Sequence, residues 1–564
     1  MKKVWAIARV TIAQALRMRL PVVLIVFLIV MVPALPFLLK TEQSLLSRLR
    51  VIMTYCMYLI IFLMSLVTLF LSCGVLANEI KQKQIYILDT KPVPRWQVLA
   101  GKWLGIMVLN AALLFVMGCA SYVILRYLGN PGTTRPALLV TTIVAGALVF
   151  LLLIASVAQW AIGYRGKWLK RALVAAVACA VVGAGAHLLR RVTPPSVELE
   201  EVLALEERLR ELEGKPLTRD GMRLMRTYQV KRKELAERAQ TQGQILVARA
   251  SARPEIPNLD HVVEAELQRL TAQGMTVPEK TADWHRKQLR KLIIHAGFVV
   301  TPRNWHEWVI TGLPKNLGPR DMITIRYLHY ASEKLQGVAV EEMVGEWKIG
   351  SEAEGTRIWE QETRSPSGTV HEFLVPGDCV SKTGKLVIRY TNMNPYPRQR
   401  WARFPYDNGL EVLYPVGTVE ANFCRGLGLI FIWLGFLAIL GLASASFLGF
   451  PVAVFLCLVV LGISLSIPLW EDLAERIYII APDRPPGDVA AETDVYLQRV
   501  VRTALYLFPD FRQCDPVPLL VEGRVVPLRM FLTSGAIILL IRGGLLALLG
   551  GWLFWRRELA ADVS

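Results

Sequence analysis

Long apolar runs lie toward both ends of this chain, and a polar middle separates them. The apolar runs lie at roughly 20–39, 51–77, 102–126, 137–163, 171–190, 426–449, 451–469 and 529–555. An α-helix needs about 20 predominantly apolar residues to cross the roughly 30 Å of hydrocarbon in a bilayer. The pattern therefore predicts a polytopic α-helical membrane protein with about eight transmembrane helices.

The neighbouring runs at 426–449 and 451–469 allow two interpretations. Gly449-Phe450-Pro451 lies between them and suits a tight turn that would separate two crossings. The alternative is a single bent, re-entrant unit. Because the combined length is sufficient for two crossings, we count two helices.

Basic residues near the ends of the runs predict the orientation of the chain. One side carries Lys2, Lys3, Arg9, Arg17, Arg19, Arg165, Lys167, Lys170, Arg171, Arg556 and Arg557. The short loops on the other side carry only Lys40, Arg48, Arg50, Arg126 and Arg135. Cytoplasmic loops are the ones enriched in Lys and Arg. We therefore expect a multi-pass protein of the cytoplasmic (inner) membrane with both termini in the cytoplasm.

The first 19 residues mix basic and apolar side chains at helical spacing, which is typical of a helix lying on the membrane surface. A secretory signal peptide is the competing interpretation, since Lys2 and Lys3 resemble its charged n-region. The apolar run that follows is long, and no A-x-A cleavage site comes after it. We therefore expect an interfacial helix and an uncleaved first membrane helix.

The polar middle, 191–425, falls outside the cytoplasm in this orientation. Its first part, 191–295, is predicted to be helical, with a short coiled-coil seam formed by Val202, Leu205, Leu209 and Leu212. Two further helices are expected at 259–273 and 279–294. The seam favours a helical hairpin, which serves either as an arm that binds a partner or as an ordinary solvated helix pair.

Residues 296–425 show a different period. Short runs rich in Val, Ile, Tyr and Trp alternate with Gly, Pro, Asn and Asp, which is typical of a β-sandwich. The tryptophans of this part are Trp305, Trp308, Trp347, Trp359 and Trp401. They could form a binding platform, but filling the sandwich core is the commoner role of tryptophan.

Together these patterns predict three regions. An N-terminal transmembrane region, 1–190, holds the interfacial helix and about five spans. An α+β extracytoplasmic domain, 191–425, is inserted after it. A C-terminal transmembrane region, 426–564, holds about three spans and an outer loop at 470–528. The composition agrees, because 53% of the 564 residues are hydrophobic and the mean hydropathy is +0.39.

The formal net charge of +18 changes this picture little. A nucleic-acid-binding protein would cluster its basic residues on a polar domain, with aromatic residues for stacking. Many of the basic residues here flank apolar runs instead, as membrane orientation requires. The lipid bilayer is therefore an expected partner, and nucleic acid is not.

The sequence contains no motif of a catalytic or metal site. No GxxxxGK[ST] occurs, so we expect no ATP hydrolysis by this chain and no cofactor of its own. HExxH, CxxC and GxSxG are also absent, and the histidines of the polar middle lack ligand spacing. Cys379, Cys424 and Cys514 lie in polar segments, but the sequence selects no disulfide among them.

Two polar residues fall within the apolar runs, His187 and Arg542. An ionisable residue inside a membrane is a functional hypothesis by default. The Gly543-Gly544 pair that follows Arg542 would let another helix approach closely. A purely structural role, with Arg542 buried in the bundle or reached by water, is an equal alternative.

The polar stretch 78–102 is the longest interruption within the first 190 residues. It carries two acidic residues, Glu79 and Asp89, against the basic residues Lys81, Lys83, Lys91, Arg95 and Lys102. Its centre, Ile85-Tyr86-Ile87-Leu88, is apolar but too short to span a bilayer. A basic loop with a short apolar core, between two membrane helices, offers a binding place for a cytoplasmic partner.

This stretch resembles the first cytoplasmic loop of ABC transporter permeases of the type-2 exporter class. The matching elements are Glu79, Ile85–Leu88, Pro92-Val93-Pro94-Arg95 and Gly101-Lys102. A threonine usual in the middle of that loop is replaced here by Ile85 or Tyr86. The ending FWRRELA is similar to the close of the last helix in this class and includes Arg556, Arg557 and Glu558. Two extra spans and the domain at 191–425 depart from the usual six-helix plan.

The resemblance implies the permease subunit of an exporter that works with a separate ABC ATPase, and this ATPase would bind the ATP. It assigns ATPase coupling to Glu79, Ile85, Tyr86, Ile87, Leu88, Pro92, Pro94, Arg95 and Lys102. A homodimer or heterodimer of permeases is expected. The alternative function is a membrane-anchored recognition or scaffold protein whose β-sandwich binds an envelope glycan or protein.

Overall fold

A computed structural model describes residues 2–15, 17–38, 45–82, 94–128, 247–272, 282–315, 317–318, 321–331, 342–394, 401–476 and 508–556, together with the single residues 227, 500 and 503. The chain divides into two compact units. Unit 1 comprises Met1–Leu246, Thr418–Ile467 and Tyr506–Ser564, and unit 2 comprises Val247–Gly417 and Pro468–Leu505. Each unit has an apolar core of its own.

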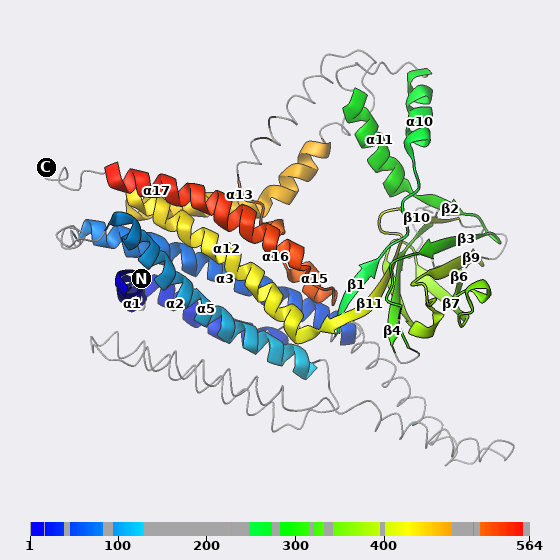
Figure 1. Cartoon of the computed structure of the whole chain (residues 1–564), viewed down its shortest axis with the longest axis horizontal. Helices are drawn as coiled ribbons and strands as arrows, with labels where there is room; N and C mark the ends of the chain where they lie inside the picture. The colour runs from blue at the N-terminus through cyan, green and yellow to red at the C-terminus, as the bar shows by residue number, and fades with distance from the viewer. Residues whose placement is uncertain are drawn as a thin grey trace. The chain divides into compact units, whose positions relative to one another are not determined.

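The described part of unit 1 is helical (Figure 1). Its described helices are α1 (Lys2–Ala15), α2 (Arg19–Leu38), α3 (Leu45–Lys81), α5 (Arg95–Leu128), α12 (Val419–Phe447), α13 (Phe450–Arg476, in this unit as far as Ile467), α15 (Val517–Val521), α16 (Leu528–Ser534) and α17 (Gly544–Arg556). A 3₁₀ turn, η5 (Phe511–Cys514), precedes α15, and a π-helical stretch, η6 (Gly535–Gly543), joins α16 to α17. Several apolar helices are therefore present, as predicted.

The described residues include five stretches that are long and apolar enough to cross a membrane. They are Leu49–Lys81, Arg95–Leu125, Val419–Phe447, Phe450–Ile467 and Leu528–Arg556. Each coincides with one of the apolar runs of the sequence. The predicted spans at 137–163 and 171–190 lie outside the described residues. The run at 20–39 forms most of α2.

The pair of runs at 426–469 forms two separate helices. α12 ends at Phe447 and α13 begins at Phe450, so the break falls at Leu448-Gly449. At the other end of α12, Thr418 is the N-cap, and its hydroxyl accepts a hydrogen bond from the Ala421 amide at 3.4 Å. Both helices are long enough for a crossing of their own, which agrees with counting two.

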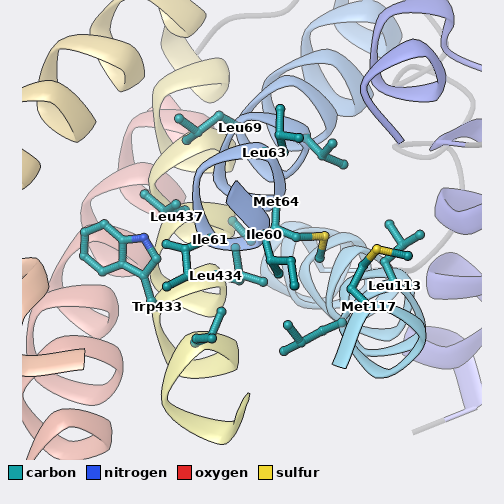
Figure 2. Close-up of a cluster of buried hydrophobic side chains, with 14 of the residues drawn as sticks. Ile60, Ile61, Leu63, Met64, Leu69, Leu113, Met117, Trp433, Leu434 and Leu437 are labelled. Atoms are coloured by element: carbon teal, nitrogen blue, oxygen red, sulfur yellow. The ribbon is translucent and has the colours of Figure 1, made fainter. Parts of the chain in front are cut away.

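The core of unit 1 lies where α3, α5 and α12 pack side by side (Figure 2). Ile60 and Met64 of α3 face Leu113 and Met117 of α5, and Leu434 of α12 packs on the other side of α3. Polar side chains tie the same helices together. The Asn110 amide of α5 donates to the Thr68 hydroxyl of α3 at 2.9 Å, and the Trp103 indole N–H of α5 donates to the Gly435 carbonyl of α12 at 3.1 Å.

The described residues of unit 2 form three β-sheets. Its strands are β1 (Val247–Ala252), β2 (Phe298–Val300), β3 (Trp305–Ile310), β4 (Met322–Leu328), β5 (Tyr330–Ala331), β6 (Glu342–Ile349), β7 (Trp359–Pro366), β8 (Val370–Pro376), β9 (Leu386–Asn392), β10 (Ala402–Phe404) and β11 (Leu410–Thr418). The strand orders are β1-β11-β4-β8, β2-β10-β5 and β3-β9-β6-β7. Buried and partly exposed residues alternate along β6 and β9, as expected for sheets with one face on a core.

The segment 191–295 was predicted to be helical, and this is wrong for β1. The strand β1 lies beside β11 in its sheet, and the buried Arg249 side chain donates to the Thr324 hydroxyl of β4 at 3.0 Å. Because β11 is distant in the sequence, a local pattern could not indicate that 247–252 forms a strand. Two helices, α10 (Asp260–Ala272) and α11 (Ala282–Ala296), lie close to the positions expected at 259–273 and 279–294. The coiled-coil seam lies outside the described residues.

The tryptophans of unit 2 divide between core and surface. Trp308 and Trp347 are buried in the core with their rings stacked at 6.2 Å, and Trp359 packs against it. Trp305 and Trp401 are exposed. The core interpretation therefore holds for most of them, and a platform of five side chains does not form.

Acidification is expected to weaken unit 2 through His329. This side chain is 1% exposed, among the rings of Tyr327, His371 and Phe404. Burial lowers its pKa from 6.5 to about 4. Between these two pH values the unfolded chain takes up a proton that the folded unit does not. The free energy of unfolding should thus fall by up to about 3 kcal/mol as the pH drops through this window.

Hydrogen exchange of β4 and β8 against pH would measure this effect. His329→Phe should flatten the pH dependence because it removes the titrating group and keeps an aromatic ring. The exposed His295 gives the matched control, His295→Gln, which should leave the slope unchanged. An unaltered slope in His329→Phe would contradict the assignment.

Candidate functional site

A buried ion pair joins the two helices that flank the predicted coupling loop. Glu79 lies in the last turn of α3, and Lys102 lies about two turns into α5. The Lys102 Nζ is 2.6 Å from the Glu79 Oε2, and the two side chains are 2% and 8% exposed. The pair therefore joins α3 and α5 close to the two ends of the loop that connects them.

Because both side chains are buried, this ion pair restricts how α3 and α5 can move relative to each other. Removing a carboxylate and an ammonium group from water is costly, and only their mutual attraction offsets that cost. Separating the charges without water would leave each one unpaired in an apolar surrounding. The pair thus fixes the relative register of α3 and α5 at the end from which the loop emerges.

Arg95, at the start of α5, connects the exit of the loop to the last helix. Its Nη1 donates to the carbonyl oxygens of Phe554 and Trp555 at 3.0 and 3.1 Å. Its guanidinium carbon also lies 5.7 Å from the centre of the Phe554 ring. The last carbonyls of a helix lack intrahelical partners and carry partial negative charge. A cationic donor at this place stabilises the end of α17.

Two glycines let α1 lie directly on the first turns of α5. A Cβ atom at Gly101 would be 2.8 Å from the Ile7 Cβ, and one at Gly105 would be 2.6 Å from the Ala8 carbonyl oxygen. Both distances are shorter than any normal contact, so a larger residue would push α1 away. The two positions form a G-x-x-x-G pattern, which allows helices to approach closely.

Exposed tryptophans surround this end of unit 1. Trp5 of α1, Trp96 of α5 and Trp555 of α17 are all largely exposed. Arg556 stacks on Trp552 with its guanidinium carbon 4.2 Å from the ring centre. Tryptophan and basic residues together are typical of a membrane–water interface.

Comparison with known families identifies the part of the chain that contains this site. Residues 5–189 match the family model described as ABC-2 family transporter protein. The resemblance to ABC-2 type permeases is confirmed. No curated protein and no solved structure matches the chain.

ABC-2 permeases are membrane transport subunits that are generally not catalytic themselves, and the family implies partnership with an ABC ATPase. The match and the apolar helices support a multi-pass membrane protein. The ion pair, Arg95 and the α1–α5 contact all lie within the ABC-2 region or contact it directly.

The described residues include only part of the predicted coupling set. Glu79, Arg95 and Lys102 make the contacts above, and Pro94 directly precedes α5. The other predicted site residues, Ile85, Tyr86, Ile87, Leu88, Pro92, His187, Arg557 and Glu558, lie outside the described residues. Arg556 ends α17 beside this cluster.

Arg542 is placed apart from the coupling cluster. It lies in η6, within the apolar stretch Leu528–Arg556, and its Nη1 donates to the Phe508 carbonyl at 2.9 Å. A backbone carbonyl is a common partner of arginine inside a membrane protein. Within the described parts of the chain, no group of three or more His, Cys, Asp or Glu residues could hold a metal ion.

Several contacts of this site were missed from the sequence. The partners of Arg95 are backbone carbonyls more than 450 residues away, and no side-chain pattern could indicate them. The G-x-x-x-G spacing of Gly101 and Gly105 was a usable signal for the α1–α5 contact, although it does not name the opposing helix.

Breaking the ion pair on one side is expected to destabilise unit 1 strongly. Lys102→Met leaves the buried Glu79 carboxylate without its partner, which should cost about 3–5 kcal/mol. The double variant Glu79→Gln/Lys102→Met removes both charges and should regain most of that loss. Denaturant or thermal unfolding of the full chain in lipid nanodiscs would measure both variants.

Lys81→Met is the matched control, because Lys81 is exposed at the end of α3 and its loss should be nearly neutral. A double variant as unstable as Lys102→Met would show that the pair is not the stabilising unit.

Proposed function

We propose that this chain is the permease subunit of an ATP-driven ABC transporter. Its partner ATPase binds the loop at 78–102. One observation carries the proposal: within the ABC-2 region, the Glu79–Lys102 pair fixes two long membrane helices to each other at the neck of this loop. A displacement of the loop is then passed to both helices together.

The contacts of this end supply a physical route for coupling. A partner ATPase that changes shape would move the loop, and the ion pair would make α3 and α5 tilt as one body. Arg95 would carry the movement to α17 through the Phe554 and Trp555 carbonyls. The α1 helix, packed on Gly101 and Gly105, would follow α5 along the membrane surface.

The remaining features of the proposal come from the sequence. They are about eight spans, a location in the cytoplasmic membrane with both termini in the cytoplasm, the regional boundaries 1–190, 191–425 and 426–564, and a β-sandwich on the far side of the membrane. Export of a substrate and a dimer of permeases complete it. The two four-stranded sheets of unit 2, which contribute to one apolar core, support the sandwich.

Acidic residues in the centre of the loop should abolish recruitment of the ATPase. Ile87→Asp/Leu88→Asp places two charges where apolar anchors for the ATPase are proposed. Losing two apolar side chains that binding would bury against the ATPase should weaken binding by about 3 kcal/mol or more. Co-purification of the full chain with an ATPase encoded by a neighbouring gene would measure this. Ile256→Asp, at an exposed apolar position of unit 2, is the control. Equal recruitment by wild type and the loop variant would refute the docking role.

Arg95→Ala should separate recruitment from transmission. The variant keeps the loop but loses both bonds to the end of α17, so ATPase binding should stay within about two-fold while the ATP-dependent change in hydrogen exchange of α17 disappears. Arg95→Lys keeps the charge and loses the planar guanidinium group. Its ATP-dependent change in hydrogen exchange of α17 should lie between those of the wild type and Arg95→Ala. If α17 responds to ATP equally in Arg95→Ala and wild type, Arg95 does not transmit the movement.

A second candidate function has one observation in its favour. On the exposed face of the β3-β9-β6-β7 sheet, the guanidinium carbon of Arg389 lies 4.4 Å from the ring centre of Trp305, and its Nη2 donates to Glu307 at 2.8 Å. Such a combination suits recognition of a glycan or a protein. Binding of envelope glycans or proteins by the full chain, lost in Trp305→Ala and insensitive to ATP, would favour a recognition or scaffold protein.

A further inference from the structure

Two cysteine thiols from different helices meet inside unit 1. The Cys73 Sγ of α3 lies 3.8 Å from the Cys457 Sγ of α13. Both residues are 0% exposed and neither forms a disulfide. The two sulfurs are thus in direct contact, and the coupling cluster uses neither of them.

A polar group of α12 lies against each of the two thiols. The Cys73 thiol lies 3.7 Å from the Gly441 carbonyl oxygen, and the Cys457 thiol lies 3.5 Å from the Ser444 hydroxyl, both on α12. A third soft sulfur lies close to the next residue of α3, since a Cβ at Gly74 would be 3.3 Å from the Met18 sulfur. The ring of Phe450, at the start of α13, also lies near Gly74, because a Cβ there would be 3.4 Å from it.

The chemistry of the pair selects a particular class of ligand. Soft sulfur ligands favour soft cations such as Cu(I), whereas hard cations require oxygen. A monovalent cation can replace the proton of one thiol, so that the metal–sulfur bond forms as the sulfur–hydrogen bond breaks and the proton leaves to water. The second thiol keeps its proton and binds through a lone pair. The net charge of the buried site stays the same, so no extra charge is desolvated.

The helix that carries Cys457 lies at the edge of the described helices of unit 1. Only 33% of the most apolar window of α13 is buried, against 78% for α3 and for α12. Ala453 and Cys457, one turn apart, are fully buried, while Phe455 and Val459 on other faces are exposed. The helix is therefore peripheral, and Cys457 lies on the face by which it meets the bundle.

We propose that Cys73 and Cys457 form a two-sulfur binding site for a monovalent soft cation, Cu(I) or Ag(I), which joins α13 to α3. Bound there, the cation would strengthen the attachment of a peripheral helix to the helix that leads into the loop at 78–102. The site is independent of the proposed ATPase partner and of any transported substrate.

Titration of the reduced full-length protein in nanodiscs with Ag(I), under anaerobic conditions, tests the proposal. We expect one equivalent to bind with two sulfur neighbours by X-ray absorption and to raise the unfolding temperature. Cys73→Ala, Cys457→Ala and the double variant should each lose that same single equivalent. Cu(I), delivered from a competing chelator, should give the same pattern.

Cys514→Ala provides the matched control, because Cys514 is another fully buried thiol of unit 1 and should leave the two-sulfur species intact. Unfolding measured without metal shows whether each variant is folded. The proposal is overturned if the two-sulfur signal persists in Cys73→Ala or Cys457→Ala, or if their losses add in the double variant. Wild-type protein that binds no Ag(I) at two sulfurs would also overturn it.

Discussion

The two helices that flank the loop at 78–102 depend on one contact, the buried attraction between Glu79 and Lys102. Opposite charges withdrawn from water have no good alternative to each other, so their 2.6 Å contact fixes where α3 and α5 meet. Other contacts lie at the same end of these helices. At the same end, Arg95 at the start of α5 reaches the Phe554 carbonyl of α17, and α1 lies against α5 at Gly101 and Gly105.

Packing elsewhere in unit 1 follows the same logic with weaker contacts. In a lipid environment, apolar side chains alone do not drive helices together, so small residues and interhelical hydrogen bonds have to do so. The bond from Asn110 to Thr68 and that from Trp103 to the Gly435 carbonyl join α5 to its two neighbours. Leu434 and its neighbours then fill the space between the helices (Figure 2). A few directional contacts therefore determine which helices are adjacent.

The sequence predicted the parts of this structure that depend on local pattern. The apolar runs that became α3, α5, α12 and α13 are long and uninterrupted, and the periodic segments that became α10 and α11 also lie within a few residues of their predicted places. β1 was missed because its strand pairing is with β11, far along the chain.

The candidate site divides in the same way. Glu79, Arg95 and Lys102 could be singled out from the sequence, because they follow the order of the ABC-2 loop. Their contacts could not, because the meeting of Glu79 with Lys102 requires a particular rotation of two helices, and the partners of Arg95 are backbone atoms. The thiol pair likewise joins residues 384 positions apart, each of which looks like a small apolar filler in its own helix.

The π-helical stretch η6 has a consequence for how the last helix can move. A π-helix holds more residues in each turn than an α-helix, and π-helical turns are frequent at functional sites. If Gly535–Gly543 rewound to α-helical geometry, α17 would turn about its own axis relative to α16, and its Arg556 end would face a new direction. A change of winding within this stretch would therefore rotate α17 relative to α16 without breaking the chain into separate helices.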